Sequence, residues 1–447
     1  MDFKEMYIHD NKKTRGNGFS RIAFVTVLFL VIAIAGFLAY QFIFISQPVL
    51  KGTDGFTVLP AAKTIVLQGK HIKSLEVSVN QGDRKIELLK GTPGGVEKTY
   101  TLQIKPKDLA LSDGIASIQV RAESGMFKKL SQDIKATIDT VPPALNIIKS
   151  PEVVSQGGAG FVVLMAKDTD SVFVKLEDRR FPAFRKPSEQ SAQDGKASYY
   201  YVFFPIPYDV KENALLYAVA QDAAGNQNVQ AIRSTIKPVS YRLSSIAIDD
   251  KFIDTVAASL LNETSISDHA SAFKKVNEDL RAKALEKLMD ISKNTDPKIL
   301  WNEAFLQLRN GQVMAVYGDK RTYQYKGNTI SHSVHLGYDL ASNAHAPVEA
   351  ANSGIIRFAG DLSIYGNTVV IDHGMGLMSL YGHLSSISVS EGQPVSRGDI
   401  IGKTGATGLA GGDHLHFGML LHGYEVSPLF WWDLHWIRVN VLDAMEG

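Results

Sequence analysis

Hydrophobic positions mark out one long apolar segment near the start of the chain. Residues 22–46 carry no charge and contain the run IAFVTVLFLVIAIAGFLAYQFIFI. A helix of that length spans about 36 Å, enough to cross a hydrocarbon core of about 30 Å. We therefore expect a transmembrane anchor over residues 22–46. A cleaved signal peptide is the alternative, because Ala33-Ile34-Ala35 resembles a cleavage site. The apolar residues that continue after it favour the uncleaved anchor.

The charges around this segment predict its orientation. Four basic residues lie within residues 12–21, and only Lys51 lies close behind the apolar run. The positive-inside rule places the more basic flank in the cytoplasm. The sequence therefore predicts a cytoplasmic tail over residues 1–21, a single pass through a bacterial inner membrane at residues 22–46, and a periplasmic location for the rest.

Between residues 50 and 140, apolar and polar positions alternate in short runs that turns separate. Alternation of this kind is typical of an antiparallel sandwich. Asp139-Thr140-Val141-Pro142-Pro143 then interrupts the pattern, and two prolines cannot continue a central strand. We expect an immunoglobulin-like (Ig-like) β-sandwich that ends at this joint. Its predicted strands include residues 64–67, 75–79, 85–89, 99–104 and 118–122.

A second β-rich run covers residues 141–240. Its segment YAVAQDAAGN, residues 217–226, reads as a strand that ends in an Asp…Gly-Asn turn. This turn and the preceding D-T-V-P-P joint resemble those of bacterial Ig-like domains. Aromatic residues at positions 199–204 form either a sugar-binding platform or part of the core, and their place in a strand favours the core. We interpret both sandwiches as spacers.

The period changes again over residues 245–300, where a helical linker is expected. Apolar residues recur there at intervals of three and four, which marks an amphipathic helix that ends near Asn294 and Pro297. A shorter helix is expected around residues 252–261. The sharper hypothesis is that residues 250–294 limit access to an active site. The apolar positions of the longer helix are Phe273, Val276, Leu280, Ala284, Leu285 and Leu288.

Composition excludes several classes of function. The chain has 447 residues, and 47 Lys and Arg against 46 Asp and Glu leave a net charge of +1. No basic excess indicates nucleic-acid binding. The lack of cysteine excludes a disulfide framework, a Cys-ligated zinc and a thiol nucleophile. Nine of the 12 histidines lie between His332 and His435, so the last quarter of the chain is where we expect the chemistry.

Two histidine motifs in this region have the spacing of a shared site. His414 and His416 lie two residues apart in a run of strand character, so their side chains share one face. His335 and Asp339 are four residues apart, about 13 Å in a straight strand. Gly337 between them permits a sharp turn that would bring the two side chains together. Imidazole and carboxylate are zinc ligands, and a catalytic zinc keeps one position for water.

A predicted hairpin supplies a third histidine. Two strand-like runs flank Gly374-Met375-Gly376, and a short Gly-containing loop predicts antiparallel pairing. If His373 lies opposite Leu377, then His383 lies opposite Asn367. Asn367 is therefore a candidate for contacting substrate or orienting a catalytic group.

Together these motifs resemble the lysostaphin/LytM-type zinc metallopeptidases, which cleave peptidoglycan peptides. The resemblance covers residues 316–432 and rests on HLGYDL, APVEAANSGIIRFAG, YGNTVVIDHG, SLYGHLS, GDIIGKTGATGLAGG and HLHF. It implies an antiparallel β peptidase domain of the duplicated-hybrid-motif type over residues 305–440, with a groove floored by the sheet. It also implies one Zn²⁺ held by His335, Asp339 and His416, and catalytic roles for His383 and His414.

The implied reaction is hydrolysis of peptide bonds in peptidoglycan during cell-wall remodelling. One of His383 and His414 takes the proton of the attacking water and the other stabilises the oxyanion, and the sequence leaves the assignment open. Tyr381 and Asp413 join Asn367 as candidates for contacts with substrate or with the catalytic groups. Asp413 stands where proline is common in the family. His345, His332, His422 and His435 are interpreted as loop, structural or exposed residues.

Two other classes of function remain as alternatives. The first is a non-catalytic relative that activates a separate murein amidase, although relatives of that kind typically lose metal ligands. The second is a surface structural or adhesion protein whose Ig-like domains are the functional part. The sequence identifies no regulatory protein partner.

Overall fold

The computed structural model describes residues 18–92, 97–186 and 196–446. Strands dominate the described part of the chain, which confirms the prediction of a mainly β protein. The chain divides into two compact units, one comprising Met1–Val141 with Ala224–Asn226 and the other comprising Pro142–Ala223 with Gln227–Gly447. The predicted cytoplasmic tail lies outside the described residues, apart from residues 18–21.

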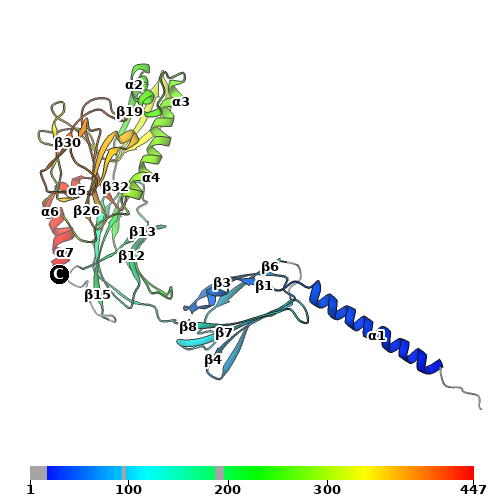
Figure 1. Cartoon of the computed structure of the whole chain (residues 1–447). Helices are drawn as coiled ribbons and strands as arrows, with labels where there is room; N and C mark the ends of the chain where they lie inside the picture. The colour runs from blue at the N-terminus through cyan, green and yellow to red at the C-terminus, as the bar shows by residue number, and fades with distance from the viewer. Residues whose placement is uncertain (1–17, 93–96, 187–195, 447) are drawn as a thin grey trace, which may run out of the picture. The chain divides into compact units, whose positions relative to one another are not determined.

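The first unit begins with the predicted apolar helix, α1 (Gly18–Ile43), at the blue end of Figure 1. Its segment Arg21–Ile43 has a mean hydropathy of 2.9 over its most apolar window and buries none of it inside the protein. This length and composition suffice to cross a membrane. A signal sequence near an N-terminus has the same properties, so the helix is a candidate span.

Two sheets follow α1 and enclose one hydrophobic core. One sheet has the order β1-β3-β6 and the other β2-β8-β7-β4-β5. Alternate residues such as Ile65, Leu67, Val77 and Val79 are buried between the sheets. Each of the five predicted strands lies within an observed one. The elements are β1 (Val49–Lys51), η1 (Thr53–Phe56), β2 (Val58–Leu59), β3 (Lys63–Lys70), β4 (Ser74–Gln81), β5 (Arg84–Gly91), β6 (Glu97–Ile104), β7 (Gly114–Glu123) and β8 (Lys129–Ile138).

The second unit opens with two four-stranded sheets, β14-β15-β11-β9 and β13-β12-β16-β17, and a short pair, β10-β18. The predicted strand and turn near residue 222 form the hairpin of β16 and β17. Tyr200, Tyr201, Phe203 and Phe204 are buried, as the core interpretation predicted. The strands are β9 (Ala144–Lys149), β10 (Val153–Ser155), β11 (Ala159–Lys167), β12 (Ser171–Leu176), β13 (Arg179–Pro182), β14 (Phe184–Arg185), β15 (Ser198–Pro205), β16 (Leu216–Gln221), β17 (Gln227–Ile232) and β18 (Thr235–Lys237).

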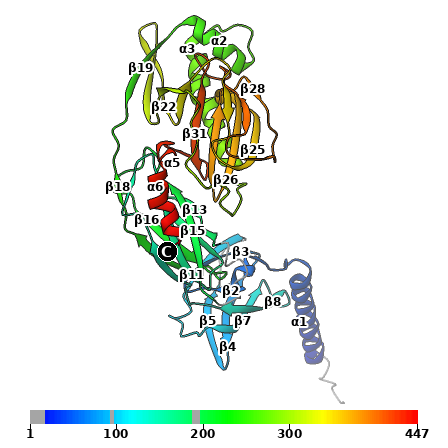
Figure 2. The ribbon, with the colours of Figure 1, turned by 90° about the vertical axis from the view of Figure 1, so that its left-hand side faces the viewer.

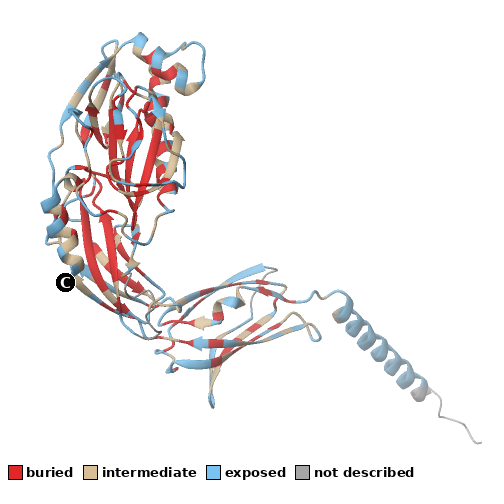
Figure 3. Ribbon diagram, turned by 60° about the vertical axis from the view of Figure 1, so that its left-hand side comes forward, coloured by how far each residue is buried: buried red, intermediate tan, exposed pale blue. Residues whose placement is uncertain are grey.

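An eight-stranded antiparallel sheet carries the histidine motifs. Its order is β20-β23-β31-β27-β26-β25-β29, with β32 paired to β31, and a smaller sheet, β24-β30-β28, accompanies it. The central strands of this sheet are buried along almost their whole length and are red in Figure 3. The strands of the two sheets are β20 (Gln312–Ala315), β23 (Tyr338–Ala341), β24 (Pro347–Glu349), β25 (Gly354–Asp361), β26 (Asn367–Gly374), β27 (Leu377–Gly382), β28 (Ser386–Ile387), β29 (Pro394–Val395), β30 (Ile400–Lys403), β31 (Leu415–Leu421) and β32 (Tyr424–Val426), with η4 (Ser363–Tyr365) between β25 and β26.

Residues 243–291, most of which belong to the predicted helical linker of residues 245–300, cover one face of this sheet. Phe273 and Leu288 pack against Leu380 and Leu420 in one hydrophobic cluster. The segment also begins with a strand, β19, which pairs in parallel with β21. Figure 2 shows α2 and α3 above the sheet and β19 and β22 beside it. We call this side the helix-covered face. Its elements are β19 (Leu243–Ile248), α2 (Asp250–Leu261), α3 (His269–Lys274), η3 (Lys275–Leu280), α4 (Arg281–Ile291), β21 (Asp319–Tyr325) and β22 (Asn328–His335).

The opposite face of the sheet packs against the preceding sandwich. Phe203 of β15, Trp301, Trp431 and Phe417 belong to one hydrophobic cluster. Short helices over residues 429–446 lie on this side, where η5 and α7 contact β11, and Figure 2 shows them along the sandwich. The second sandwich and the sheet therefore share a core. These helices are α5 (Leu429–Trp432), α6 (Leu434–Ile437), η5 (Arg438–Leu442) and α7 (Asp443–Glu446).

The helical cover is expected to contribute strongly to stability. Leu288 of α4 is fully buried, at 0 % exposure, and a Leu→Ala change in a core typically costs about 2–5 kcal/mol. We expect Leu288→Ala to lower the free energy of unfolding by that amount in urea titrations. The matched control is Leu434→Ala, since Leu434 is 54 % exposed. Equal stability of the two variants would show that the helices do not pack as described.

Candidate active site

The register of the eight-stranded sheet brings two members of the predicted site together. Asp339 of β23 and Gly382 of β27 lie directly opposite His416 of β31, one on either side. Opposed residues share a face, so all three point to the helix-covered face. A Cβ added at Gly382 would lie 3.5 Å from the Cβ of His416. It would also lie 3.3 Å from the carbonyl oxygen of Tyr365. Gly382 therefore leaves room for Tyr365 to pack beside His416.

His335 reaches the same place from a different sheet. It is the last residue of β22, and the chain then bends at Gly337 into β23. The bend needs no left-handed glycine, because Gly337 is not among the residues with positive φ. A Cβ at Gly337 would instead lie 2.6 Å from Cε1 and Nε2 of His416. Glycine is needed here because the His416 ring fills the space of a side chain.

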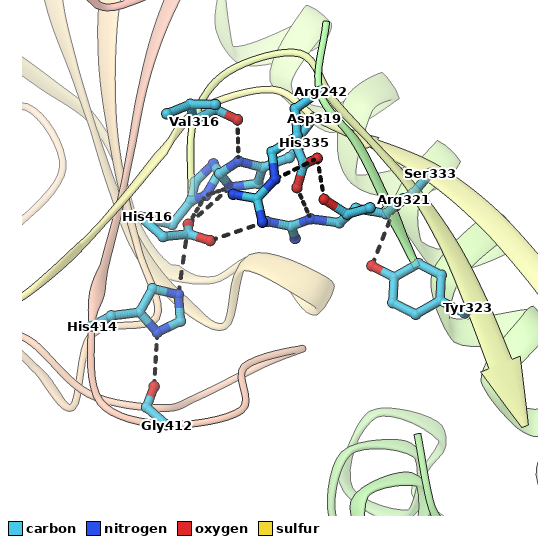
Figure 4. Close-up of polar contacts among 12 residues, drawn as sticks. Arg242, Val316, Asp319, Arg321, Tyr323, Ser333, His335, Gly412, His414 and His416 are labelled. Atoms are coloured by element: carbon cyan, nitrogen blue, oxygen red, sulfur yellow. Dashed lines mark hydrogen bonds and ion pairs between the residues drawn. The ribbon is translucent and has the colours of Figure 1, made fainter. Parts of the chain in front are cut away.

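Three potential ligand atoms converge at this point. His335 Nε2 lies 2.9 Å from Asp339 Oδ1 and 3.1 Å from His416 Nδ1. His416 Nδ1 lies 2.9 Å from the same carboxylate oxygen. Figure 4 shows His335 and His416 side by side, with His414 and Arg321 on different sides of them. The three residues that the sequence assigned to a metal therefore form one cluster.

The chemistry of this cluster fits a cation. His335 Nδ1 lies 3.0 Å from the carbonyl oxygen of Val316. Since a carbonyl only accepts, Nδ1 carries the proton and Nε2 of the neutral ring has the lone pair. The ionised carboxylate of Asp339 is also an acceptor only. In tetrahedral zinc sites, bonds of about 2.0–2.1 Å place neighbouring ligand atoms about 3.3 Å apart. Two imidazoles and a carboxylate at the observed spacing therefore suit zinc.

Two further histidines lie beside the cluster with matching hydrogen bonds. His414 Nδ1 lies 2.7 Å from the carbonyl oxygen of Gly412, and His383 Nδ1 lies 2.8 Å from that of Thr407. Each carbonyl holds a proton on Nδ1 and leaves Nε2 as the basic nitrogen. The two ring centroids are 4.8 Å apart, and His414 Nε2 is 3.6 Å from Asp339 Oδ1. The pair is thus placed for proton transfer next to the cluster.

His383 combines backbone strain with deep burial. Its φ of 61° lies in the left-handed region, which costs a non-glycine residue about 1–2 kcal/mol, and such strain is frequent at functional sites. Its backbone N–H donates to the carbonyl of Tyr365 at 2.7 Å. Burial lowers the pKa of His383 to about 3 and that of His416 to about 4. Both rings are therefore neutral at pH 7.

Arg321 stands behind Asp339 and was not anticipated from the sequence. Burial by itself raises the pKa of Asp339, but the charges and hydrogen bonds of His335 and His416 outweigh it and hold that pKa well below its usual range. Arg321 Nη2 donates to Asp339 Oδ2 at 3.4 Å, and its Nε donates to Asp319 at 3.3 Å. The guanidinium thus fixes the carboxylate oxygen that faces away from the cluster.

The cluster opens into a pocket of about 290 Å³. Ile246 and Ile248 of β19 and Phe252 of α2 form part of its wall, together with Tyr365. The segment before the sheet therefore contributes directly to the site. The hypothesis that it limits access stays a prediction. A chain that begins near Ile299 would lack this segment, but it would also lose the helices that cover the hydrophobic core. Substitutions at Phe252 are therefore the better test of whether the segment limits access to the pocket.

Tyr381, Asn367 and Asp413 were predicted to contact substrate or catalytic groups, and none of their side chains belongs to the His–Asp cluster. Tyr381 lies opposite Phe417, on the other face of the sheet, and its hydroxyl accepts from the backbone N–H of Ala351 at 2.7 Å. Asn367 is not among the residues that line the pocket, although its carbonyl accepts from the N–H of Leu384 next to His383. The structure therefore brings neither side chain to the cluster.

Asp413 holds the loop that leads into β31. Its carboxylate accepts from Thr404 Oγ1 at 2.6 Å and from the backbone N–H of His345 at 3.1 Å. These contacts fix the chain immediately before His414. The remaining histidines lie apart from the cluster: His435 is exposed on α6, His332 is exposed on β22, and His422 bonds to the carbonyl of Phe203.

Comparison with known proteins identifies this domain. Residues 333–428 match the model of Peptidase family M23. His335, Asp339, His383, His414 and His416 all fall within that range. The chain carries a C-terminal M23 peptidase domain. The resemblance to lysostaphin/LytM-type peptidases that the motifs indicated is thereby confirmed.

Curated relatives match about a quarter of the chain. The chain is 39% identical over 109 residues to DD-carboxypeptidase/endopeptidase Mpg of Neisseria meningitidis, covering 24% of this chain and 25% of that protein. It is 40% identical over 95 residues to peptidoglycan DD-endopeptidase ShyA of Vibrio cholerae, covering 21% and 22%. The matches thus span about a quarter of these relatives. Among solved structures, the catalytic domain of lysostaphin from Staphylococcus simulans is 29% identical, with a TM-score of 0.24 and coverage of 29% of this chain and 96% of that one.

A buried histidine on β26 predicts how the stability of the M23 domain depends on pH. Burial lowers the pKa of His373 to about 4, below the unfolded value of about 6.5. Its stabilising contribution is therefore complete above pH 6.5 and is lost as the pH falls toward 4, at up to about 1.4 kcal/mol per pH unit. We expect His373→Gln, which does not titrate, to flatten the dependence of unfolding free energy on pH between 6.5 and 4. His435→Gln, at an exposed position, should leave the slope unchanged. An identical slope in His373→Gln would refute this assignment.

Proposed function

We propose that this protein is a membrane-anchored zinc metalloendopeptidase that hydrolyses peptide bonds of peptidoglycan. The observation that carries the proposal is the convergence of His335, Asp339, His383, His414 and His416 within an M23 domain. Curated relatives named as peptidoglycan endopeptidases support the substrate class.

His335, Asp339 and His416 would hold the zinc. When bound, the ion supplies a Lewis acid that polarises the scissile carbonyl and makes water more acidic. Arg321 keeps the Asp339 carboxylate oriented through its contact with Oδ2. The pocket walls formed by Ile246, Ile248 and Phe252 limit the water that surrounds the reacting groups.

The two remaining histidines would manage the proton. His383 is neutral and has a pKa of about 3, so it is a weak base. His414 is more exposed and is therefore the better acceptor for the proton of the attacking water. It then returns this proton to the leaving amine. The lone pair on His383 Nε2 orients the water by accepting its other hydrogen.

The membrane part of the proposal rests on α1 and on the charges before it. Residues 22–46 would cross the inner membrane once, with the described β domains in the periplasm and the Ig-like sandwiches as spacers. A reporter active only outside the cytoplasm should be active when fused after Gly447 and inactive when fused before Ile22. The reverse pattern would contradict both the location and the substrate.

Hydrolysis of isolated murein sacculi tests the reaction. The full chain in detergent should release soluble material, a chelator should stop the release, and added zinc should restore it. An activator of a separate amidase would release nothing unless that amidase were present. A structural or adhesion protein would bind sacculi without releasing fragments, so either result would reject the proposal.

A further inference from the structure

A second cavity lies next to the metal pocket, between β19, the β21–β22 hairpin and α4. Its volume is about 670 Å³, which is in the range of small-molecule binding sites. Arg281, Lys320 and Arg321 line it together with His332 and with hydroxyl-bearing and apolar side chains, and no Asp or Glu is among its lining residues. The cavity is therefore strongly basic.

Two of these three cations are available for an incoming anion. Arg281 donates to the carbonyl and the side-chain oxygen of Asn277, at 3.0 and 2.9 Å, and both acceptors are neutral. Neither Arg281 nor Lys320 forms an ion pair within the described part of the chain, and Lys320 Nζ lies 5.9 Å from the ring of Tyr241. Arg321 differs, because Asp319 and Asp339 already engage it.

The neighbouring carboxylates do not neutralise the cavity. Asp319 is already paired with Arg321 at 3.3 Å and with Arg242 at 4.0 Å. Glu278 accepts a hydrogen bond from Ser331 at 2.8 Å and does not line the cavity. Glu425, whose charge reaches Arg281, is buried beneath the hydroxyl of Tyr365, and burial raises its pKa to about 7. The positive charges of Arg281 and Lys320 therefore face the cavity without a paired carboxylate in its lining.

The cavity adjoins the metal pocket. Arg281 and Arg321 line both. An extended peptide advances about 3.3 Å per residue, so a substrate with its scissile bond over the metal pocket reaches the adjoining cavity through residues further along the peptide. Most of the lining comes from before residue 333, where the family match begins. Most of the cavity therefore lies outside the residues that match the family model.

We propose that this cavity is a substrate subsite in which Arg281 and Lys320 bind a carboxylate of the peptide whose bond is cleaved. The inference rests on the proposed peptidase function and adds to it a preference for acidic peptides. Two cations and no competing carboxylate make the carboxylate the favoured partner, because charge-assisted hydrogen bonds are stronger than neutral ones.

The test compares two substrates that differ only in charge. Cross-linked peptides released from murein are used as they are, or after their carboxylates are converted to carboxamides. The full chain in detergent should cleave the acidic form with a kcat/KM at least about tenfold higher, the effect of one charge-assisted hydrogen bond. Arg281→Gln and Lys320→Gln should each remove most of this preference by raising KM for the acidic form.

Two controls separate binding from folding. Lys287→Gln removes a positive charge from the exposed side of the same helix and should keep the preference. Arg281→Lys keeps the charge and should restore part of it. Equal rates of the wild-type chain on both substrates, or an unchanged preference in both glutamine variants, would overturn the subsite alone. Failure of the wild-type chain to cleave the acidic peptides would overturn the proposed function itself.

Discussion

Replacing His414 with alanine is expected to lower kcat/KM on murein by at least about 100-fold while the protein keeps its fold and its metal. The size follows from the loss of a general acid–base group, which typically contributes 10²- to 10⁴-fold. The geometry supports this role, since the carbonyl of Gly412 fixes the proton on Nδ1 and Nε2 lies 3.6 Å from Asp339 Oδ1. His383→Ala should have a loss of similar order, because its ring lies beside that of His414.

The controls for this prediction are a matched histidine and the metal content. His435→Ala removes an exposed histidine from α6 and should retain the wild-type rate. Zinc analysis and circular dichroism should give wild-type values for His383→Ala and His414→Ala. Near wild-type rates in both active-site variants would show that these histidines do not take part in catalysis.

Substituting Asp339 or His416 should weaken zinc binding, and the loss of zinc should in turn lower the activity. Asp339→Asn and His416→Ala each change one of the three proposed ligands. Losses of about 10–100-fold in affinity follow even when a residue that merely supports a ligand is changed, so we expect zinc binding at least about 100-fold weaker. The purified variants should contain substoichiometric zinc and lose activity on sacculi.

Asp361→Asn is the matched control, because Asp361 is exposed and only caps the turn at Ser363. Its zinc content and its rate should equal those of the wild-type chain. Full zinc content in both Asp339→Asn and His416→Ala would mean that the zinc binds at another site.

The cluster was predictable because its members lie in short motifs with fixed geometry. His414 and His416 share a face by strand periodicity alone, and the hairpin register predicted from the Gly374-Met375-Gly376 loop holds from Asp372 to Val369. Tyr381 shows the limit of such reasoning. It is adjacent in sequence to Gly382, which faces His416, so its own side chain points to the opposite face and into the core.

Contacts between segments far apart in the chain could not be predicted, because no short sequence motif encodes them. Arg321 precedes Asp339 by 18 residues and belongs to a different sheet, so its pairing with the carboxylate depends on how β21 and β23 meet. The helices of residues 250–291 were predictable from their periodicity, but their packing partners, Leu380 and Leu420, were not. The strand β19 was missed because its parallel partner lies more than seventy residues further along the chain, at β21.

Mass spectrometry of the fragments that the full chain releases from murein sacculi tests the central claim most directly. The reaction is run with zinc, after chelation, and after zinc is restored. We predict peptide fragments with new amino termini at the cross-links in the first and third samples, intact sugar strands, and no release in the second. Fragments from sugar cleavage, or peptide release that persists without zinc, would contradict the account.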